Sequence, residues 1–297
     1  MDNCLKKVLE YLPDRLSEAV GMLPEDVKAK TDELRLRRGG LFSVTAGGRN
    51  YGLLPGGRLC HLPEGITVTP EETDECIARL CESSLYSYDD TIRRGYIPFP
   101  FGRAGVCGEA VCEGGTVARL KTITSINLRV HRFIPDCAAG IVKRYARGGV
   151  CGTLIYSPPG MGKTTLLRSA AALLAEGKYT RPYRVAVADE RNEIILPGCR
   201  HGLTDVISGC PKAEAVEMLC RCMSPEVIIC DEIGRAETEQ LLKAADCGTA
   251  LICSAHAADT GSLEDRGFIG PGRKNLFPLL VRATRTDGIY GFTAEEI

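Results

Sequence analysis

The sequence lacks an excess of charge of one sign, a long apolar run and any pair of cysteines in CxxC spacing. Its 37 basic residues balance 38 acidic ones, which leaves a formal net charge of −1. Such a balance gives no general attraction for nucleic acid or for a membrane surface. No run of about 18 apolar residues occurs, so the sequence predicts no helix that spans a bilayer. The opening stretch MDNCLKKVLEYLPDRL has the charged, amphipathic pattern of a surface helix and not that of a signal peptide.

Cysteine, in contrast, is abundant. There are fifteen cysteines, an odd number, scattered along the chain. This distribution predicts neither a disulfide framework nor a metal cluster. We therefore expect reduced thiols that pack mostly as small hydrophobic side chains, and a cytoplasmic protein.

The first part of the chain, residues 1–134, has the pattern of a small α+β domain. Glycine pairs separate short strand-like stretches, and Thr69 followed by Pro70 predicts the start of a helix. Two alternating stretches flank Gly114–Gly115 and predict a β-hairpin. Residues 135–149, PDCAAGIVKRYARGG, are predicted to form a connector that includes a short helix.

From residue 150 to residue 297, buried strand-like runs alternate with helical stretches. Such alternation is typical of an α/β domain with a mainly parallel sheet and crossover helices. Near the end, Asp287–Gly288 lies between two alternating runs and predicts a hairpin. The 297 residues are enough for both domains to have a hydrophobic core.

A phosphate-binding loop (P-loop) is predicted between a strand that ends near Tyr156 and a helix that begins at Lys163. In such loops, glycines and a helix N-terminus direct backbone N–H groups at phosphate. Lys163 would contact the β- and γ-phosphates during catalysis, and Thr164 would be a Mg²⁺ ligand. We expect the nucleotide to be bound by Ser157, Pro158, Pro159, Gly160, Met161, Gly162, Lys163, Thr164 and Thr165.

Ser157 stands where the P-loop pattern usually has its first glycine. The substitution matters only if that position needs a positive φ, which non-glycine residues rarely adopt. The adjacent prolines set the bend of the loop. We therefore expect the serine to be tolerated.

The stretch PEVIICDEIG supplies two acids at the end of another buried strand. Asp231 would hold Mg²⁺ through water, and Glu232 would polarise the attacking water. This pair indicates a hydrolase of ATP and not a kinase. A second catalytic carboxylate candidate is Glu190, in the strand-end sequence Asp189-Glu190-Arg191, which could also form only a local salt bridge.

The last buried strand ends at Ser254 and His256. Ligands in open α/β sheets lie at this edge, so His256 is a candidate for a contact with the γ-phosphate. The alternative for His256 is a capping or hydrogen-bonded core histidine.

Several stretches together resemble the stage III sporulation protein AA family: SPPGMGKTTLLR, VADERNEI, PKAEAVEMLCRCMSPEVIICDEIG, LICSAHAADT and, upstream, SLYSYDDTIRRGYIPFPFGRAGVCGEAV and LKTITSINLRVHR. More distantly, the chain resembles the RecA-type ATPases of type II and type IV secretion. The resemblance implies that residues 150–297 form a RecA-like P-loop core. It also implies a ring-shaped homo-oligomer, a hexamer in those relatives.

The same resemblance implies ATP and Mg²⁺ as ligands and a cytoplasmic protein, peripheral to the membrane on the mother-cell side. Its partners would be membrane-embedded proteins of the sporulation channel. Arginines of the N-terminal domain reach the nucleotide in the secretion ATPases, which makes Arg129 the candidate and Arg132, on the opposite strand face, the weaker one. An ordinary surface or interface salt bridge is the alternative for Arg129. The role of Arg221, ahead of the acidic strand, is left open because its spacing differs from that in the relatives.

Three functions are consistent with these residues. The leading one is a Mg²⁺-dependent ATPase that oligomerises and powers assembly or transport at a membrane complex. The second is a nucleic-acid motor, although no aromatic residues interleave with the basic ones as single-strand binding favours, and we do not expect nucleic acid as a partner. The third is a nucleotide-gated structural subunit with little turnover, against which Glu232 argues.

Overall fold

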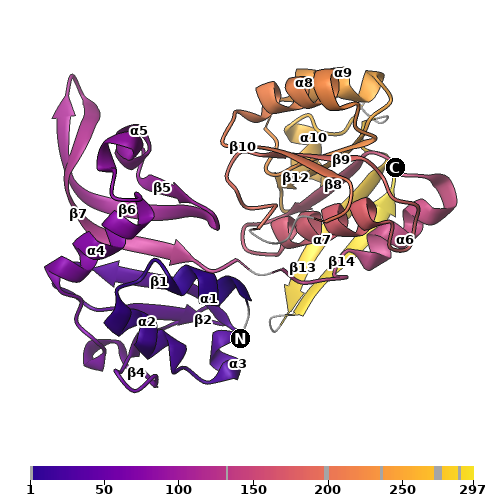
Figure 1. Cartoon of the computed structure of the whole chain (residues 1–297). Coiled ribbons are helices and arrows are strands. Elements are labelled where there is room, and N and C mark those ends of the chain that lie inside the picture. The colour runs from indigo at the N-terminus through magenta and orange to yellow at the C-terminus, as the bar shows by residue number, and fades with distance from the viewer. Residues whose placement is uncertain (1–2, 132, 197–200, 235–236, 271–275, 287–288) are drawn as a thin grey trace. The chain divides into compact units, whose positions relative to one another are not determined.

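The computed structural model describes residues 3–131, 133–196, 201–234, 237–270, 276–286 and 289–297. The chain divides into two compact units, Met1–Arg132 and Phe133–Ile297 (Figure 1). Among the described residues, no helix combines the length and the apolar character that crossing a membrane requires.

The first unit is built on a seven-stranded antiparallel sheet with the order β4-β3-β2-β1-β7-β6-β5. Its strands are β1 (Thr31–Arg37), β2 (Ser43–Ala46), β3 (Arg49–Leu53), β4 (Leu59–Cys60), β5 (Tyr96–Phe99), β6 (Gly102–Glu113) and β7 (Thr116–Arg129). Its helices are α1 (Asn3–Leu9), α2 (Asp14–Gly21), α3 (Glu25–Lys28), α4 (Pro70–Leu80) and α5 (Asp89–Arg93), with short 3-10 turns at Leu62–Glu64 and Leu85–Tyr88.

Local sequence explains two of these elements. Helix α4 begins with a capping box, in which Thr69 accepts from the backbone N–H of Glu72 and the Glu72 carboxylate accepts from the backbone N–H of Thr69. The β6–β7 hairpin turns at Gly114 and Gly115, both with positive φ. The predicted helix start and the predicted hairpin are therefore both confirmed.

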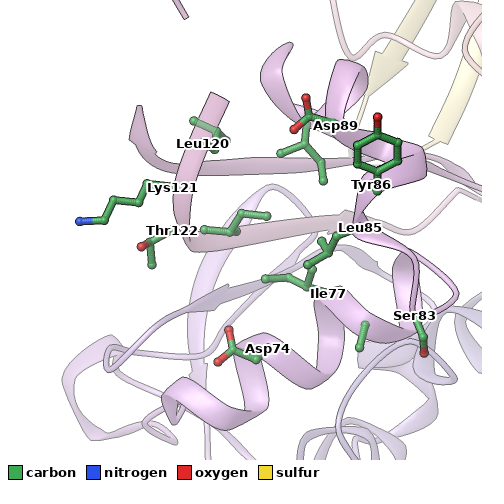
Figure 2. A pocket seen from close by; sticks show the side chains of 12 residues that line it. Asp74, Ile77, Ser83, Leu85, Tyr86, Asp89, Leu120, Lys121 and Thr122 are labelled. Carbon is green, nitrogen blue, oxygen red and sulfur yellow. The ribbon is translucent and has the colours of Figure 1, made fainter. Parts of the chain in front are cut away.

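A hollow of about 600 Å³ lies within the first unit (Figure 2). It is bounded by α4, the turn Leu85–Tyr88, α5 and four consecutive residues of β7. Its wall is mainly apolar, with Ile77, Leu85 and Leu120, and Asp89 lies at its rim. The residues predicted to bind the phosphates and Mg²⁺ are all outside this hollow.

The second unit is built on a seven-stranded sheet with the order β10-β9-β11-β12-β8-β13-β14. All neighbours are parallel except β13 and β14, which form the predicted hairpin; its turn residues Asp287–Gly288 lie outside the described residues. The strands are β8 (Thr153–Ser157), β9 (Val185–Asp189), β10 (Thr204–Ser208), β11 (Val227–Cys230), β12 (Ala250–His256), β13 (Leu279–Thr286) and β14 (Ile289–Glu296). The predicted mainly parallel α/β domain is confirmed.

Helices cover both faces of this sheet (Figure 1). They are α6 (Ala139–Gly148), α7 (Lys163–Glu176), α8 (Lys212–Met223), α9 (Thr238–Asp246) and α10 (Thr260–Asp265). Ile155 of β8 packs in the core with α6 and α7, whereas its neighbours Leu154 and Tyr156 pack in the core with α8, α9 and α10. Side chains alternate along a strand, so a strand covered on both faces must be apolar throughout.

The structure differs from two expectations. The predicted connector, residues 135–149, belongs to the second unit, because Ile141, Val142 and Tyr145 of α6 are buried in its core. The boundary between the units accordingly falls between residues 132 and 133. Strand β10 was not predicted; its partly exposed sequence TDVIS lacks the continuous apolar run of a central strand because β10 lies at the sheet edge.

Candidate functional site

The predicted P-loop connects the end of β8, at Ser157, to the start of α7, at Lys163. Gly160 and Gly162 have φ values of 78° and 95°, so both need the freedom of glycine. Ser157 is the last residue of β8, is fully buried, and is absent from the non-glycine residues with positive φ. Its hydroxyl donates to the Pro158 carbonyl at 3.1 Å. The backbone at Ser157 therefore has ordinary strand geometry, which any residue can adopt. For this reason the first glycine of the pattern is not required at this position.

Lys163 lies buried at the start of α7, with its ammonium turned toward the loop. Nζ donates to the carbonyls of Ser157 (3.0 Å) and Pro158 (3.1 Å) and lies 2.9 Å from Nδ1 of His256. Burial lowers the pKa of the Lys163 ammonium, and the nearby Asp231 and Glu232 partly offset that effect. An anion bound beside this buried ammonium would stabilise its charged form.

His256 connects Lys163 to Glu232. Because an ammonium can only donate hydrogen bonds, Nδ1 of His256 accepts from Lys163. The ring proton is then on Nε2, which donates to Oε1 of Glu232 at 2.9 Å. His256 is thus hydrogen-bonded within the site, at the carboxyl end of β12, and does not cap a helix.

Asp231 lies directly against the P-loop. Its Oδ2 accepts from the Thr164 hydroxyl at 2.5 Å, and its Oδ1 accepts from the Ser254 hydroxyl. The two strands β11 and β12 are neighbours in the sheet, which brings Asp231 and Ser254 together. The predicted pair of Mg²⁺ ligands, Thr164 and Asp231, is therefore contiguous, and both supply the oxygen ligands that Mg²⁺ prefers.

Glu232 is held in an unusual backbone conformation. Its φ is 48°, in the left-handed region that a non-glycine residue seldom adopts. The backbone N–H donates to Asp231 Oδ1 (2.9 Å) and to the Ser254 hydroxyl (3.0 Å), and the backbone carbonyl accepts from Lys212 Nζ (2.9 Å). These contacts hold the backbone of Glu232 in place.

The Glu232 carboxylate accepts from two cationic or donor groups, His256 through Oε1 and Arg191 Nη1 through Oε2. Burial acts to raise the pKa of this carboxyl, but Arg191, His256 and Lys212 together lower it below its ordinary value. Glu232 is therefore ionised at neutral pH, as an acceptor of a proton from water must be.

The sequence Asp189-Glu190-Arg191 divides into three separate roles. Asp189 is buried and accepts from the backbone N–H groups of residues 193–195, so it orders the following loop. Burial raises its pKa, and these hydrogen bonds partly offset the increase. Glu190 Oε2 lies 3.2 Å from Lys212 Nζ. Arg191 pairs with Glu232 and not with Glu190, which differs from the local salt bridge considered from the sequence.

The remaining predicted residues are placed as follows. Pro158 and Pro159 are exposed, and Met161 and Thr165 are half-buried, in the loop and the first turn of α7. Arg129 lies in the first unit, is 57% exposed and is 3.7 Å from Glu33; its contact with nucleotide stays a prediction. Arg132 lies outside the described residues.

Arg221 is on the exposed side of α8 and pairs with Glu217 four residues earlier, which gives it no part in the site as described. One residue of this cluster, Lys212, was not predicted. The sequence carries one signal for it, a lysine at the first position of a helix, where the helix dipole disfavours a cation. The structure shows that this lysine is also buried. Its contacts with Glu190 and with the Glu232 carbonyl explain that placement.

Comparison with solved structures supports the same fold. The chain is similar to the ATPase DotB of Legionella pneumophila (TM-score 0.57, 16% identity, covering 91% of this chain and 77% of DotB). It is also similar to DotB of Yersinia pseudotuberculosis (TM-score 0.59, 15% identity, 91% and 76%). A third similar structure is the pilus retraction motor PilT with bound ADP (TM-score 0.58, 17% identity, 92% and 80%). The identities are low, so these similarities establish the RecA-like fold alone.

Comparison of sequences is more specific. The chain is 34% identical over 284 residues to the stage III sporulation protein AA of Bacillus subtilis (strain 168), covering 92% of this chain and 87% of that protein. The family model described as "Sporulation stage III, protein AA" matches residues 7–281. The chain therefore belongs to the stage III sporulation protein AA family.

Proposed function

We propose that this chain is a Mg²⁺-dependent ATPase. The observation that carries the proposal is the 2.5 Å contact between the Thr164 hydroxyl and Asp231, beside the glycines of the P-loop. This is where a nucleotide-bound Mg²⁺ needs its protein ligands, next to backbone N–H groups that receive phosphate. Bound Mg²⁺ would neutralise charge on the β- and γ-phosphates.

Lys163 would provide the charge that holds the phosphates. Its ammonium is now satisfied by two loop carbonyls and His256, and it would exchange some of these for phosphate oxygens. Arg191 offers a second cation: its Nε is buried and has no partner within the part of the chain that the structure describes. A phosphate oxygen is a suitable acceptor for that donor.

Glu232 would accept the proton of the attacking water. Both of its carboxylate oxygens are engaged, by His256 and by Arg191, so water must replace at least one of these contacts. A phosphate that attracts Arg191 would weaken the ion pair between Arg191 and Glu232. A phosphate that attracts Lys163 would weaken the hydrogen bond from Lys163 to His256, and with it the hydrogen bond from His256 to Glu232. Nucleotide binding would thereby free the Glu232 carboxylate to accept a proton from water.

The energy of hydrolysis would drive assembly or transport at a membrane complex during sporulation. The family membership and the fold shared with DotB and PilT support this role. We further propose a ring-shaped homo-oligomer, a hexamer by its resemblance to secretion ATPases, on the cytoplasmic face of the membrane. Its partners would be membrane-embedded sporulation channel proteins.

A second candidate function is a nucleotide-gated subunit with little turnover. The engagement of both Glu232 oxygens favours it, because a carboxylate in two such contacts is a poor base until one is broken. The two candidates share the nucleotide site and differ in rate.

Steady-state ATP hydrolysis measured against protein concentration distinguishes them. The ATPase proposal predicts Mg²⁺-dependent turnover whose specific rate rises with concentration as the oligomer forms. ATP binding without measurable turnover at any concentration would favour the gated subunit, and absence of ATP binding would contradict both. Parallel samples with single-stranded DNA or RNA test the nucleic-acid motor, for which several-fold stimulation is required.

A further inference from the structure

We infer that Tyr290, supported by Arg285, is the surface on which the base of the bound nucleotide stacks. The inference rests on the proposed function, because it takes the P-loop as the site of the phosphates. It adds a contact for the nucleoside, for which the sequence motifs identify no residue.

The position of the β13–β14 hairpin provides the first step (Figure 1). β13 runs parallel to β8 and pairs with it up to Arg282, opposite Tyr156. β8 ends one residue later, at Ser157, whereas β13 continues to Thr286 before the chain returns in β14. The described strands of the hairpin, up to Thr286 and from Ile289, therefore extend beyond the carboxyl end of β8.

Tyr290 contacts that loop directly. A Cβ atom added at Gly162 would lie 2.3 Å from Cδ1 and 2.6 Å from Cε1 of Tyr290, which is closer than any real contact allows. The edge of the ring thus lies against the glycine that precedes Lys163. Gly162 is needed here for two reasons, its φ of 95° and the approach of this ring.

Arg285 supports the ring. It is the residue opposite Tyr290 in the antiparallel pairing, and the carbon at the centre of its guanidinium lies 5.1 Å from the ring centroid. A guanidinium at this distance makes a cation–π contact that orients the ring. Arginine also stacks on planar groups, so it can extend the surface that a base meets.

The direction of the nucleotide provides the second step. The groups that act on the γ-phosphate, Glu232 and His256, follow β11 and end β12, and both strands lie on one side of β8. The γ-phosphate must face that side. The α-phosphate, which carries the ribose and base, then points to the other side of β8, where β13 and β14 are.

An aromatic ring is the side chain that suits a base. Stacking on an aromatic residue is tolerant of base identity and is lost when the ring is removed. Tyr290 is half-buried, so the ring is not enclosed by the fold. The expected ligand is thus the planar, aromatic base of a nucleoside di- or triphosphate, with its phosphates on the P-loop.

The chain contains no tryptophan, which allows a direct test. In the Tyr290→Trp variant of the full chain, the single indole reports whether a base approaches it. We expect its emission to change on addition of Mg²⁺ with ATP or ADP, and to stay unchanged with Mg²⁺ and inorganic tripolyphosphate. The Tyr179→Trp variant, with its indole elsewhere in the second unit, is the control and should respond to none of them. Emission that responds equally to ATP and tripolyphosphate would overturn the inference, as would no response while calorimetry records ATP binding.

Calorimetry on substitutions that remove the ring gives an independent readout. We expect Tyr290→Leu to weaken ATP binding roughly tenfold or more. The same variant should change tripolyphosphate binding by less than about twofold. Tyr290→Phe, which keeps the ring, should bind both ligands as wild type does. If Tyr290 only supports the P-loop, the Leu variant will lose both ligands equally, which contradicts a base contact. Wild-type protein that binds neither ATP nor tripolyphosphate would instead refute the proposed function itself, and the two failures are thus distinguishable.

Discussion

Lys163 Nζ and His256 Nδ1 lie 2.9 Å apart, and the other ring nitrogen of His256 lies 2.9 Å from Glu232 Oε1. One imidazole therefore joins the residue expected to bind phosphate to the residue expected to activate water. A change in the partner of Lys163 alters the hydrogen bond that His256 can offer to Glu232. The expected phosphate contact of Lys163 and the state of the Glu232 carboxylate would therefore be coupled through two hydrogen bonds.

Lys163→Ala should abolish ATP binding and leave the fold intact, because Lys163 makes polar contacts at the loop and contributes no apolar packing to the core. A lost charge-assisted hydrogen bond costs roughly 1.5–3 kcal/mol, and Lys163 would make more than one to phosphate. Calorimetry with Mg²⁺ and ATP measures the effect. Lys178→Ala is the matched control, since Lys178 is exposed and pairs with Asp136. An alanine variant at 163 that binds ATP as tightly as wild type would show that the P-loop assignment is wrong.

Ser157→Gly should weaken the fold without improving ATP binding. Ser157 has ordinary strand geometry, so glycine there adds backbone entropy to the unfolded chain and also removes the hydroxyl that donates to the Pro158 carbonyl. The backbone term alone lowers the free energy of unfolding by roughly 0.5–1 kcal/mol. Denaturant unfolding and calorimetry together check both statements. The reverse change, Gly160→Ser, places a side chain at a φ of 78° and should weaken ATP binding. Tighter ATP binding by the Ser157→Gly variant would mean that the serine impairs the loop.

The pH dependence of stability should reveal the environment of Glu232. Its pKa in the folded protein is lowered from an ordinary value of 4.5. A carboxyl with a lowered folded pKa stabilises the protein fully above its unfolded pKa, and that contribution disappears as the pH falls through the folded pKa. Glu232→Gln cannot titrate. The stability difference between wild type and this variant should therefore be larger at neutral pH than below pH 4.5, measured by denaturant unfolding. A difference that is constant with pH would contradict the ion pair with Arg191.

Residues 133–297 should fold alone, whereas residues 150–297 should not. The shorter chain lacks α6, and with it the buried side chains of Ile141, Val142 and Tyr145. A fully buried large apolar side chain is worth about 1.5–3 kcal/mol, so losing three removes a large part of typical domain stability. Circular dichroism and thermal unfolding of both chains decide the matter. Cooperative unfolding of residues 150–297 would contradict the assignment of α6 to the core.

The sequence predicts elements well where local signals are strong. Thr69 and Glu72 mark the start of α4, Gly114–Gly115 marks a hairpin, and the apolar run at Val227–Cys230 marks a central strand. Edge strand β10 and the core role of α6 were missed, because both depend on tertiary neighbours that no local pattern encodes.

The site shows the same limit. Thr164, Asp231 and Glu232 were predicted at one sheet edge because the carboxyl ends of parallel strands meet there. The pairing of Arg191 with Glu232, and of Glu190 with Lys212, could not be predicted. It depends on the order β9-β11-β12-β8 and on the left-handed φ of Glu232, neither of which follows from residue spacing.

The most direct test of the proposed ATPase is the Glu232→Gln variant, compared with wild type for both ATP binding and turnover. The amide keeps the shape of the side chain but cannot accept a proton from water. We predict that the variant binds ATP with Mg²⁺ about as tightly as wild type by calorimetry and shows no steady-state phosphate release. Glu190→Gln, which removes the carboxylate that pairs with Lys212 and leaves Glu232 in place, should retain hydrolysis. Undiminished phosphate release by Glu232→Gln, with loss of release by Glu190→Gln, would contradict the assignment of Glu232 as the residue that activates water.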